Sequence, residues 1–211
     1  MLKKGFTIVE LLIVIVVIGV LAAVSVAAFG EVQQRARNSA RISSARAWQS
    51  IITQYYEAND SQLPATSARM CLGYGYLRDL DANMTDEDCG RYYLLSHPND
   101  TWMNAFRTIA NPLPAYPNDK MVNANDSSIW NSGIVFSSTD TYDVANENRA
   151  NYPYLTYWLY GFNKDCVLRP VLRNAAGGGL VAVPSATYSY TGSASQITEC
   201  RIGVFDISRL Q

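Results

Sequence analysis

Residues 1–30 read MLKKGFTIVELLIVIVVIGVLAAVSVAAFG, a basic start followed by a long apolar run. The nineteen residues 11–29 carry no charge, and thirteen of them are Leu, Ile, Val or Phe. As an α-helix they would be roughly 28 Å long, close to the hydrocarbon thickness of a bilayer, and their insertion is favourable by on the order of 6 kcal/mol. Lys3 and Lys4 favour a cytoplasmic N-terminus. The stretch therefore predicts a single membrane-spanning helix with the rest of the chain exported.

Glu10 is the one acidic residue in this stretch. A carboxylate near the centre of a membrane helix costs up to about 3 kcal/mol and less near the helix end, so insertion remains favourable. Two interpretations are open. The side chain either reaches the lipid headgroups beside Lys3 and Lys4, or it is kept for an oppositely charged partner.

The residues around Glu10 resemble a known processing signal. A short basic leader, then Gly5, then Phe6-Thr7-Ile8-Val9-Glu10-Leu11-Leu12, resembles the prepilin-peptidase signal of type IV pilins and type II secretion pseudopilins. The resemblance implies cleavage between Gly5 and Phe6 by a membrane prepilin peptidase, followed by methylation of the new amine. It also implies that Glu10 is an assembly residue, which meets the N-terminal amine of an adjacent subunit. Loss of both lysines would change the formal side-chain charge from −1 to −3.

A secretory signal is a competing interpretation of the N-terminal stretch. An ordinary secretory signal cut near Ala27 would have a basic start and small residues, but its apolar core is usually 7–15 residues long and an acid there is unfavourable.

Many members of the pilin family have a proline in the later part of the apolar helix. Residues 24–28 here read VSVAA, so Gly19 is the remaining candidate for a weak point in the helix.

Composition bounds the rest of the chain. With 211 residues, the protein has room for the membrane segment and one globular domain of about 150 residues. Its net charge of −1 gives no overall nucleic-acid signature. Four cysteines in an exported chain favour disulfides, and they permit three pairings. The pairs Cys71–Cys89 and Cys166–Cys200 are favoured because each closes a local loop.

The helix is predicted to continue beyond the membrane. Residues 31–58 contain no Gly or Pro. Apolar residues recur there at three- or four-residue spacing, which predicts an amphipathic helix: Ile42, Ala45, Trp48, Ile52 and Tyr55. Asn59-Asp60-Ser61 and Pro64 predict its end. One helix from Phe6 to about Ala58 would be roughly 80 Å long.

Four arginines follow the apolar run, with Glu31 as the nearby acid: Arg35, Arg37, Arg41 and Arg46. They could contact lipid phosphates or acidic patches on neighbouring subunits. The alternative is a solvated helix face. DNA binding is disfavoured because no aromatic residues lie between these arginines.

The remainder predicts an irregular region and then a sheet. Residues 61–130 have short apolar clusters, and in pilins this place is taken by a variable loop. Five later segments are rich in β-branched and aromatic residues: 134–136, 154–162, 167–172, 180–183 and 197–205. Gly177-Gly178-Gly179 suggests either a hairpin connection or a mobile loop. We expect an α+β, pilin-like fold in which the helix packs on a C-terminal antiparallel sheet of four or five strands. The Cys166–Cys200 pair resembles the disulfide-bounded segment of pilins.

Catalytic and metal-binding patterns are weak. The acidic cluster Asp79, Asp81, Asn83, Asp86, Glu87 and Asp88 resembles the start of a calcium loop, but Met84 stands where the turn glycine belongs and Gly90 where the bidentate glutamate belongs. A solvated loop is the simpler interpretation, and no metal site is assigned. His97 is the single histidine. Asn83, Asn99 and Asn125 fit a glycosylation pattern that often arises by chance. We expect no enzyme activity and no cofactor.

These observations lead to one functional hypothesis. The chain is expected to be a structural subunit of a type IV pilus-like filament that serves motility, adhesion or DNA uptake. It comprises a leader (1–5), a membrane and filament-core helix (6–29), an amphipathic continuation (30–58) and an exported domain (59–211), with a variable loop at about 61–130 and a sheet at about 134–211.

The hypothesis also predicts the partners of the chain and its location in the cell. Expected partners are copies of itself, a prepilin peptidase, an assembly platform, minor pilins and the membrane, with nucleic acid only in a DNA-uptake pilus. The chain would lie in the bacterial cell membrane and then in an extracellular pilus. The alternatives are a type II secretion pseudopilin in a periplasmic pseudopilus, and a membrane-anchored binding domain that does not polymerise.

Overall fold

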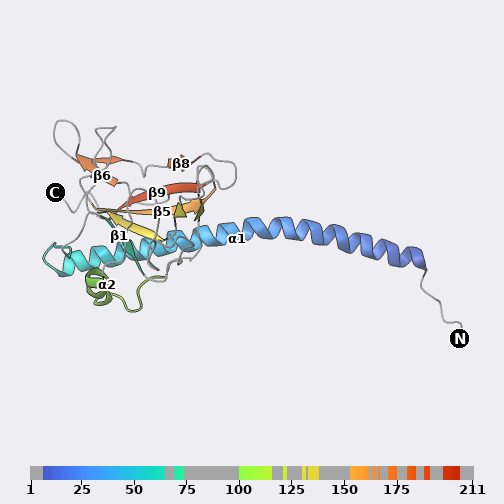
Figure 1. Ribbon diagram of the computed structural model, residues 1–211, viewed down its shortest axis with the longest axis horizontal. Helices are drawn as coiled ribbons and strands as arrows, with labels where there is room; N and C mark the ends of the chain where they lie inside the picture. Colours follow the sequence, from blue (N-terminus) through green and yellow to red (C-terminus); the bar gives the residue numbers. More distant parts are fainter. Residues whose placement is uncertain are drawn as a thin grey trace, which may run out of the picture. The chain divides into compact units, whose positions relative to one another are not determined.

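A computed structural model describes residues 7–64, 69–73, 100–115, 121–122, 130–131, 133–137, 153–161, 164, 166, 171–174, 180–183, 188–190 and 197–204. The chain forms two units, Met1–Ser39 and Ala40–Gln211. Helix α1, Ile8–Ala58, contributes residues to both (Figure 1).

The first unit presents the apolar part of α1 to its surroundings. The described side chains from Ile8 to Val32 are all exposed. By length and composition α1 could cross a membrane, and none of its most apolar window is buried. Ser25 is the one hydroxyl in residues 11–29, and its Oγ donates a 2.8 Å hydrogen bond to the Leu21 carbonyl oxygen. The helix therefore satisfies this polar group internally, as an apolar environment requires.

In the second unit, α1 turns one face into the core. Ala45, Trp48 and Ile52 are buried, and Ile42 and Tyr55 pack against them. The predicted amphipathic stripe is thereby confirmed. The helix ends at Ala58 as expected, where the Ser61 amide donates a 3.0 Å hydrogen bond to the Tyr56 carbonyl. Asp60 and Ser61 have positive φ angles of 51° and 58°, which is typical of a chain closing a helix C-terminus.

A five-stranded antiparallel sheet packs on this part of α1. Its strand order is β1 (Arg69–Leu72), β4 (Ile134–Ser137), β5 (Tyr154–Tyr160), β9 (Ile197–Gly203) and β8 (Tyr188–Tyr190). Gln49 Nε2 donates a 2.6 Å hydrogen bond to the Gly203 carbonyl. The Thr53 hydroxyl is shared between the Gln49 carbonyl at 2.8 Å and the Val204 carbonyl at 3.2 Å. The predicted α+β class, with the long helix packed on an antiparallel sheet, is confirmed.

The strand composition of this sheet differs from the expectation. β6 (Val171–Asn174) and β7 (Leu180–Val183) pair with each other in a separate two-stranded sheet. β5 has β4 and β9 as its neighbours, and β9 has β5 and β8, so the main sheet is completed by β1 and β8 at its two ends and not by β6 or β7. The other two places are filled by β1, a segment expected to be irregular, and by β8, which was not among the predicted strands. The three glycines 177–179 lie outside the described residues.

The region expected to be irregular also contains α2 (Asp100–Arg107) and β2 (Met121–Val122), which pairs with β3 (Trp130–Asn131). Trp102, Met103 and Phe106 of α2 are buried. The Phe106 ring meets three aromatic rings edge-on, and its centroid lies 6.0, 5.5 and 5.3 Å from those of Trp48, Tyr55 and Trp102. Through these rings, α2 packs beside the C-terminal part of α1 (Figure 1).

Replacement of Gly161 by alanine is expected to destabilise the second unit by about 1–3 kcal/mol. Gly161 follows β5 with φ of +106°, and an added Cβ would overlap the Lys164 side chain. The lysine can move, but the backbone strain remains. Gly19→Ala is the matched control, since a Cβ there meets nothing within 4 Å. Thermal unfolding in detergent, followed by tryptophan fluorescence, should show a lower melting temperature for Gly161→Ala alone. Equal melting temperatures would contradict the prediction.

Candidate assembly site at the start of helix α1

Thr7 and Glu10 form a closed hydrogen-bonded pair at the first turn of α1. The Thr7 amide and hydroxyl donate to Glu10 Oε2 at 2.8 and 2.7 Å, and the Glu10 amide donates to Thr7 Oγ1 at 3.3 Å. The Thr7 carbonyl accepts the first helical hydrogen bond, from the Leu11 amide at 3.3 Å. Thr7 is therefore the N-cap and Glu10 the third helical residue of a capping box.

The capping box gives Glu10 a structural role that the sequence analysis missed. The signal was present, because Thr7-x-x-Glu10 ahead of an apolar run is the capping-box pattern. A carboxylate at a helix N-terminus also interacts favourably with the positive end of the helix dipole. Glu10 is thus both the start signal of α1 and the single acid of its apolar segment.

No other charge lies near Glu10 along the described part of α1. Residues 11–30 are uncharged, and the next acid, Glu31, forms a 3.5 Å ion pair with Arg35 in which both side chains are exposed. Such an exposed pair contributes little to stability. The apolar helix therefore carries one isolated carboxylate. At this turn of the described helix, the hydrogen bonds that Glu10 Oε2 accepts both come from Thr7.

Removal of the cap should loosen the first turn of α1. We expect Thr7→Ala to cost about 1 kcal/mol of local helix stability because the two hydrogen bonds made by the hydroxyl are lost. Amide hydrogen exchange of Glu10 and Leu11, whose amides bond to Thr7, should then be roughly fivefold faster in detergent micelles. Thr7→Ser keeps the hydroxyl and is the matched control. Unchanged exchange in Thr7→Ala would show that the capping box does not hold this turn.

The processing residues of the sequence analysis, Gly5 and Phe6, lie outside the described residues. Cleavage between them stays a prediction. Thr7, which would become the second residue of the mature chain, begins the described part.

The four arginines divide into two groups. Arg35, Arg37 and Arg46 are exposed, whereas Arg41 is fully buried, with its guanidinium 4.6 Å from the centre of the Tyr160 ring. Arg41 is therefore not part of a solvated face or a lipid-binding row. Its cation–π contact ties α1 to the end of β5 inside the second unit.

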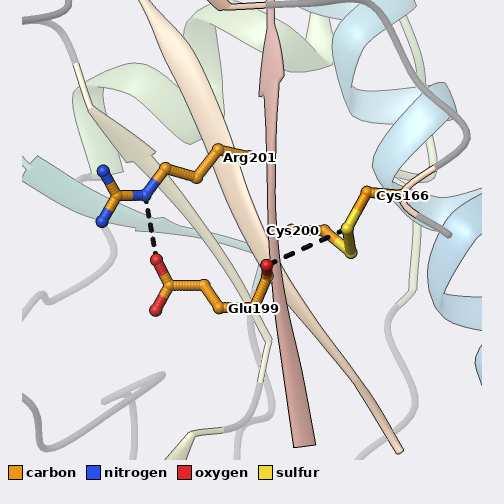
Figure 2. Close-up of polar contacts among 4 residues, drawn as sticks. All are labelled: Cys166, Glu199, Cys200 and Arg201. Atoms are coloured by element: carbon orange, nitrogen blue, oxygen red, sulfur yellow. Dashed lines mark hydrogen bonds and ion pairs between the residues drawn. A yellow bond between two sulfur atoms is a disulfide. The ribbon is translucent and has the colours of Figure 1, made fainter. Parts of the chain in front are cut away.

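The Cys166–Cys200 disulfide joins the segment after β5 to the middle of β9 (Figure 2). Glu199 and Arg201, on either side of Cys200, form a 2.9 Å ion pair on the opposite face of the strand. Cys166 Sγ lies 3.9 Å from the Glu199 carbonyl oxygen, a van der Waals contact because a disulfide sulfur carries no hydrogen. Thr198 Oγ1 donates to the Gly161 carbonyl and accepts from the Lys164 amide. These contacts fix the start of the disulfide-closed loop on β9.

The remaining candidates are only partly described. Cys71 is disulfide-bonded, whereas Cys89, its predicted partner, lies outside the described residues. The acidic cluster from Asp79 to Asp88, His97 and the three asparagines of the glycosylation patterns also lie outside them. Within the described ranges, no group of three His, Cys, Asp or Glu side chains is placed to hold a metal ion.

Comparison with known proteins bears on the start of α1. Residues 1–26 match the family model described as the prokaryotic N-terminal methylation motif. These residues carry a type IV pilin signal. The pilin signal includes the Thr7–Glu10 capping box and the Gly5–Phe6 bond.

Curated relatives support the pilin signal. The chain is 41% identical over 66 residues to a fimbrial protein of Neisseria meningitidis serogroup A, a match that covers 31% of this chain and 38% of the relative. It is 46% identical over 55 residues to the type IV major pilin protein PilE1 of Neisseria gonorrhoeae, covering 26% of this chain and 33% of that pilin. The matches thus span about a third of the length of these relatives. No solved structure gives a significant match.

Proposed function

We propose that this protein is a structural subunit of a type IV pilus-like filament, processed after Gly5 and assembled through α1. The observation that carries the proposal is the first unit, an exposed apolar helix with one carboxylate, Glu10, at its start. An apolar surface of this length is not stable in water and calls for lipid or other helices. Transfer from a bilayer to a bundle of such helices keeps the apolar surface out of water, so assembly meets no large hydrophobic penalty.

Glu10 is the proposed assembly residue. Cleavage would leave a methylated ammonium on Phe6, and this charge on an adjacent subunit is the proposed partner of the carboxylate. Opposite charges attract strongly in an apolar environment when they are desolvated together. The capping box is compatible with this role because it gives one carboxylate oxygen, Oε2, two donors within the isolated chain and so lowers the cost of keeping the acid in lipid.

The exported domain would face water in the assembled filament. The proposed route is a single-pass helix in the bacterial cell membrane, with a leader of residues 1–5 and a core helix of residues 6–29, followed by incorporation into an extracellular pilus. The proposed partners are prepilin peptidase, the assembly platform, minor pilins and further copies of this chain. Motility, adhesion and DNA uptake are the candidate uses, and Cys71–Cys89 is the proposed second disulfide.

A type II secretion pseudopilin is the second candidate, since it would share the processing signal and the helix. The similarity to proteins named as type IV major pilins favours a pilus. A membrane-anchored binding domain that does not polymerise is the candidate from another class, and it would have no use for a processed N-terminus.

Mass spectrometry of the N-terminal peptide tests the proposal, in material sheared from cells and in the membrane fraction. We expect a peptide that begins with methylated Phe6 in the sheared material. The same peptide confined to membranes would favour a pseudopilin. An N-terminus near Ala28, or an uncut Met1–Lys4 leader, would contradict the filament assignment.

A further inference from the structure

Three buried polar groups lie on facing elements of the second unit. Ser44 and Trp48 belong to α1 and Tyr157 to β5, and their side chains are 6%, 0% and 0% exposed. Ser44 Oγ, Trp48 Nε1 and the Tyr157 hydroxyl have no hydrogen-bond partner among the described residues. Buried polar groups are nearly always hydrogen-bonded, so three such groups require an explanation.

The register of α1 on the sheet brings the three groups to one level. At one end, the Arg41 guanidinium lies over the ring of Tyr160, the last residue of β5. At the other end, Gln49 bonds to Gly203, which pairs with Tyr154, the first residue of β5. Tyr157 is the midpoint of β5 and therefore lies alongside the α1 turn that contains Ser44 and Trp48.

The side-chain directions agree with this register. Leu155, Tyr157 and Leu159 alternate along β5 and belong to the same core cluster as Trp48. Ser44 and Trp48 are four residues apart, so they lie one above the other on the same helix face.

The chemistry of the three groups is complementary to one small polar molecule. The indole Nε1–H of Trp48 can only donate, whereas the two hydroxyls can donate and accept. A tyrosine is neutral at physiological pH, and burial raises the pKa of Tyr157 further, so the phenol keeps both capacities. A buried water typically makes about three hydrogen bonds to such groups.

We propose that Ser44, Trp48 and Tyr157 bind one internal water molecule between α1 and β5. The water accepts a hydrogen bond from the Trp48 indole Nε1–H and donates its two O–H groups to the hydroxyl oxygens of Ser44 and Tyr157, so that each of the three groups has a partner. The water links the helix of the second unit to a central strand of the sheet. This site is independent of processing and filament assembly.

A water-detected NMR experiment on the full chain in detergent micelles tests for the water directly. The chain has four tryptophans, and Trp48→Phe assigns the indole signal of Trp48. We expect a cross-peak between long-lived water and the Trp48 indole proton in the parent chain, and its loss in the Ser44→Ala/Tyr157→Phe double variant. Absence of the cross-peak in the parent chain would overturn the proposal. A cross-peak that persists in the double variant would also overturn it.

A stability measurement gives an independent test. If Tyr157 binds a water, Tyr157→Phe breaks a hydrogen bond and should raise the unfolding constant about fivefold in denaturant titrations of the full chain. If the hydroxyl is dry and unsatisfied, its removal should leave the unfolding constant unchanged or lower it, which would overturn the proposal. The control is Tyr55→Phe, because Tyr55 is half-buried beside Phe106 and outside the proposed site.

Discussion

Replacement of Glu10 by lysine is expected to abolish the recovery of sheared filaments from cells while the chain still accumulates in the membrane. The substitution would put a second positive charge beside the ammonium that the proposed cleavage leaves on Phe6, and like charges repel strongly where water is excluded. It also removes the acceptor of the two Thr7 hydrogen bonds. Quantification of the chain in sheared and membrane fractions measures the effect, which we expect to exceed tenfold, about 1.4 kcal/mol or more.

Two further variants isolate the role of the Glu10 charge. One keeps the cap without the charge, and the other reverses a charge elsewhere on the same helix. Glu10→Gln preserves the capping box, since glutamine can take the same place, but removes the charge. We expect it to fail in assembly like Glu10→Lys. Glu31→Lys is the matched charge reversal on the same helix, where the carboxylate forms only an exposed pair with Arg35. Normal filaments from Glu10→Gln, or loss of filaments in Glu31→Lys, would contradict the assignment of Glu10 as the assembly residue.

Removal of the Cys166–Cys200 disulfide should destabilise the second unit by about 4 kcal/mol. The bond closes a loop with a sequence separation of 34 residues, and its loss restores conformational entropy to the unfolded chain. The double variant Cys166→Ser/Cys200→Ser, unfolded by denaturant and followed by tryptophan fluorescence, should show a lower midpoint. Cys200 is fully buried, so Cys166→Ala/Cys200→Ala is the comparison that avoids burial of a new hydroxyl.

Both double variants should unfold at a lower denaturant concentration than the parent chain. If the serine double variant is much less stable than the alanine double variant, the difference is the cost of burying a hydroxyl at position 200. An alanine pair as stable as the parent chain would contradict a stabilising role for the disulfide.

The helix and the fold class could be predicted because their signals are local and repeated. An uninterrupted apolar run, a stripe at helical spacing through Trp48 and Ile52, and a polar stop at residues 59–61 together determine α1. The long strands β5 and β9 are rich in aromatic and β-branched residues and were also predictable.

Other parts depend on contacts distant in sequence. β1 is only four residues long and becomes a strand by pairing with β4, more than 60 residues later. β6 and β7 pair with each other and not with the main sheet, a choice between strand partners that a local residue pattern does not encode. Arg41 could not be told from its exposed neighbours, because its burial depends on the ring of Tyr160 in β5. In the candidate assembly site, Glu10 stands out by its isolation in the apolar run, and its proposed role in assembly comes from the resemblance to the pilin signal; its Thr7 cap follows a local pattern, Thr-x-x-Glu, that was not predicted.

The position of the Cys166–Cys200 bond has a consequence for proteolysis. A protease that cuts one peptide bond between the two cysteines produces two fragments that stay covalently joined. The C-terminal fragment would carry β9, which pairs with both β5 and β8, so the cut chain retains the strand that these two neighbours need. Such a nick would pass unnoticed on a non-reducing gel and would separate the fragments only after reduction. A protein exposed to extracellular proteases could thus be clipped in this loop and still keep its sheet.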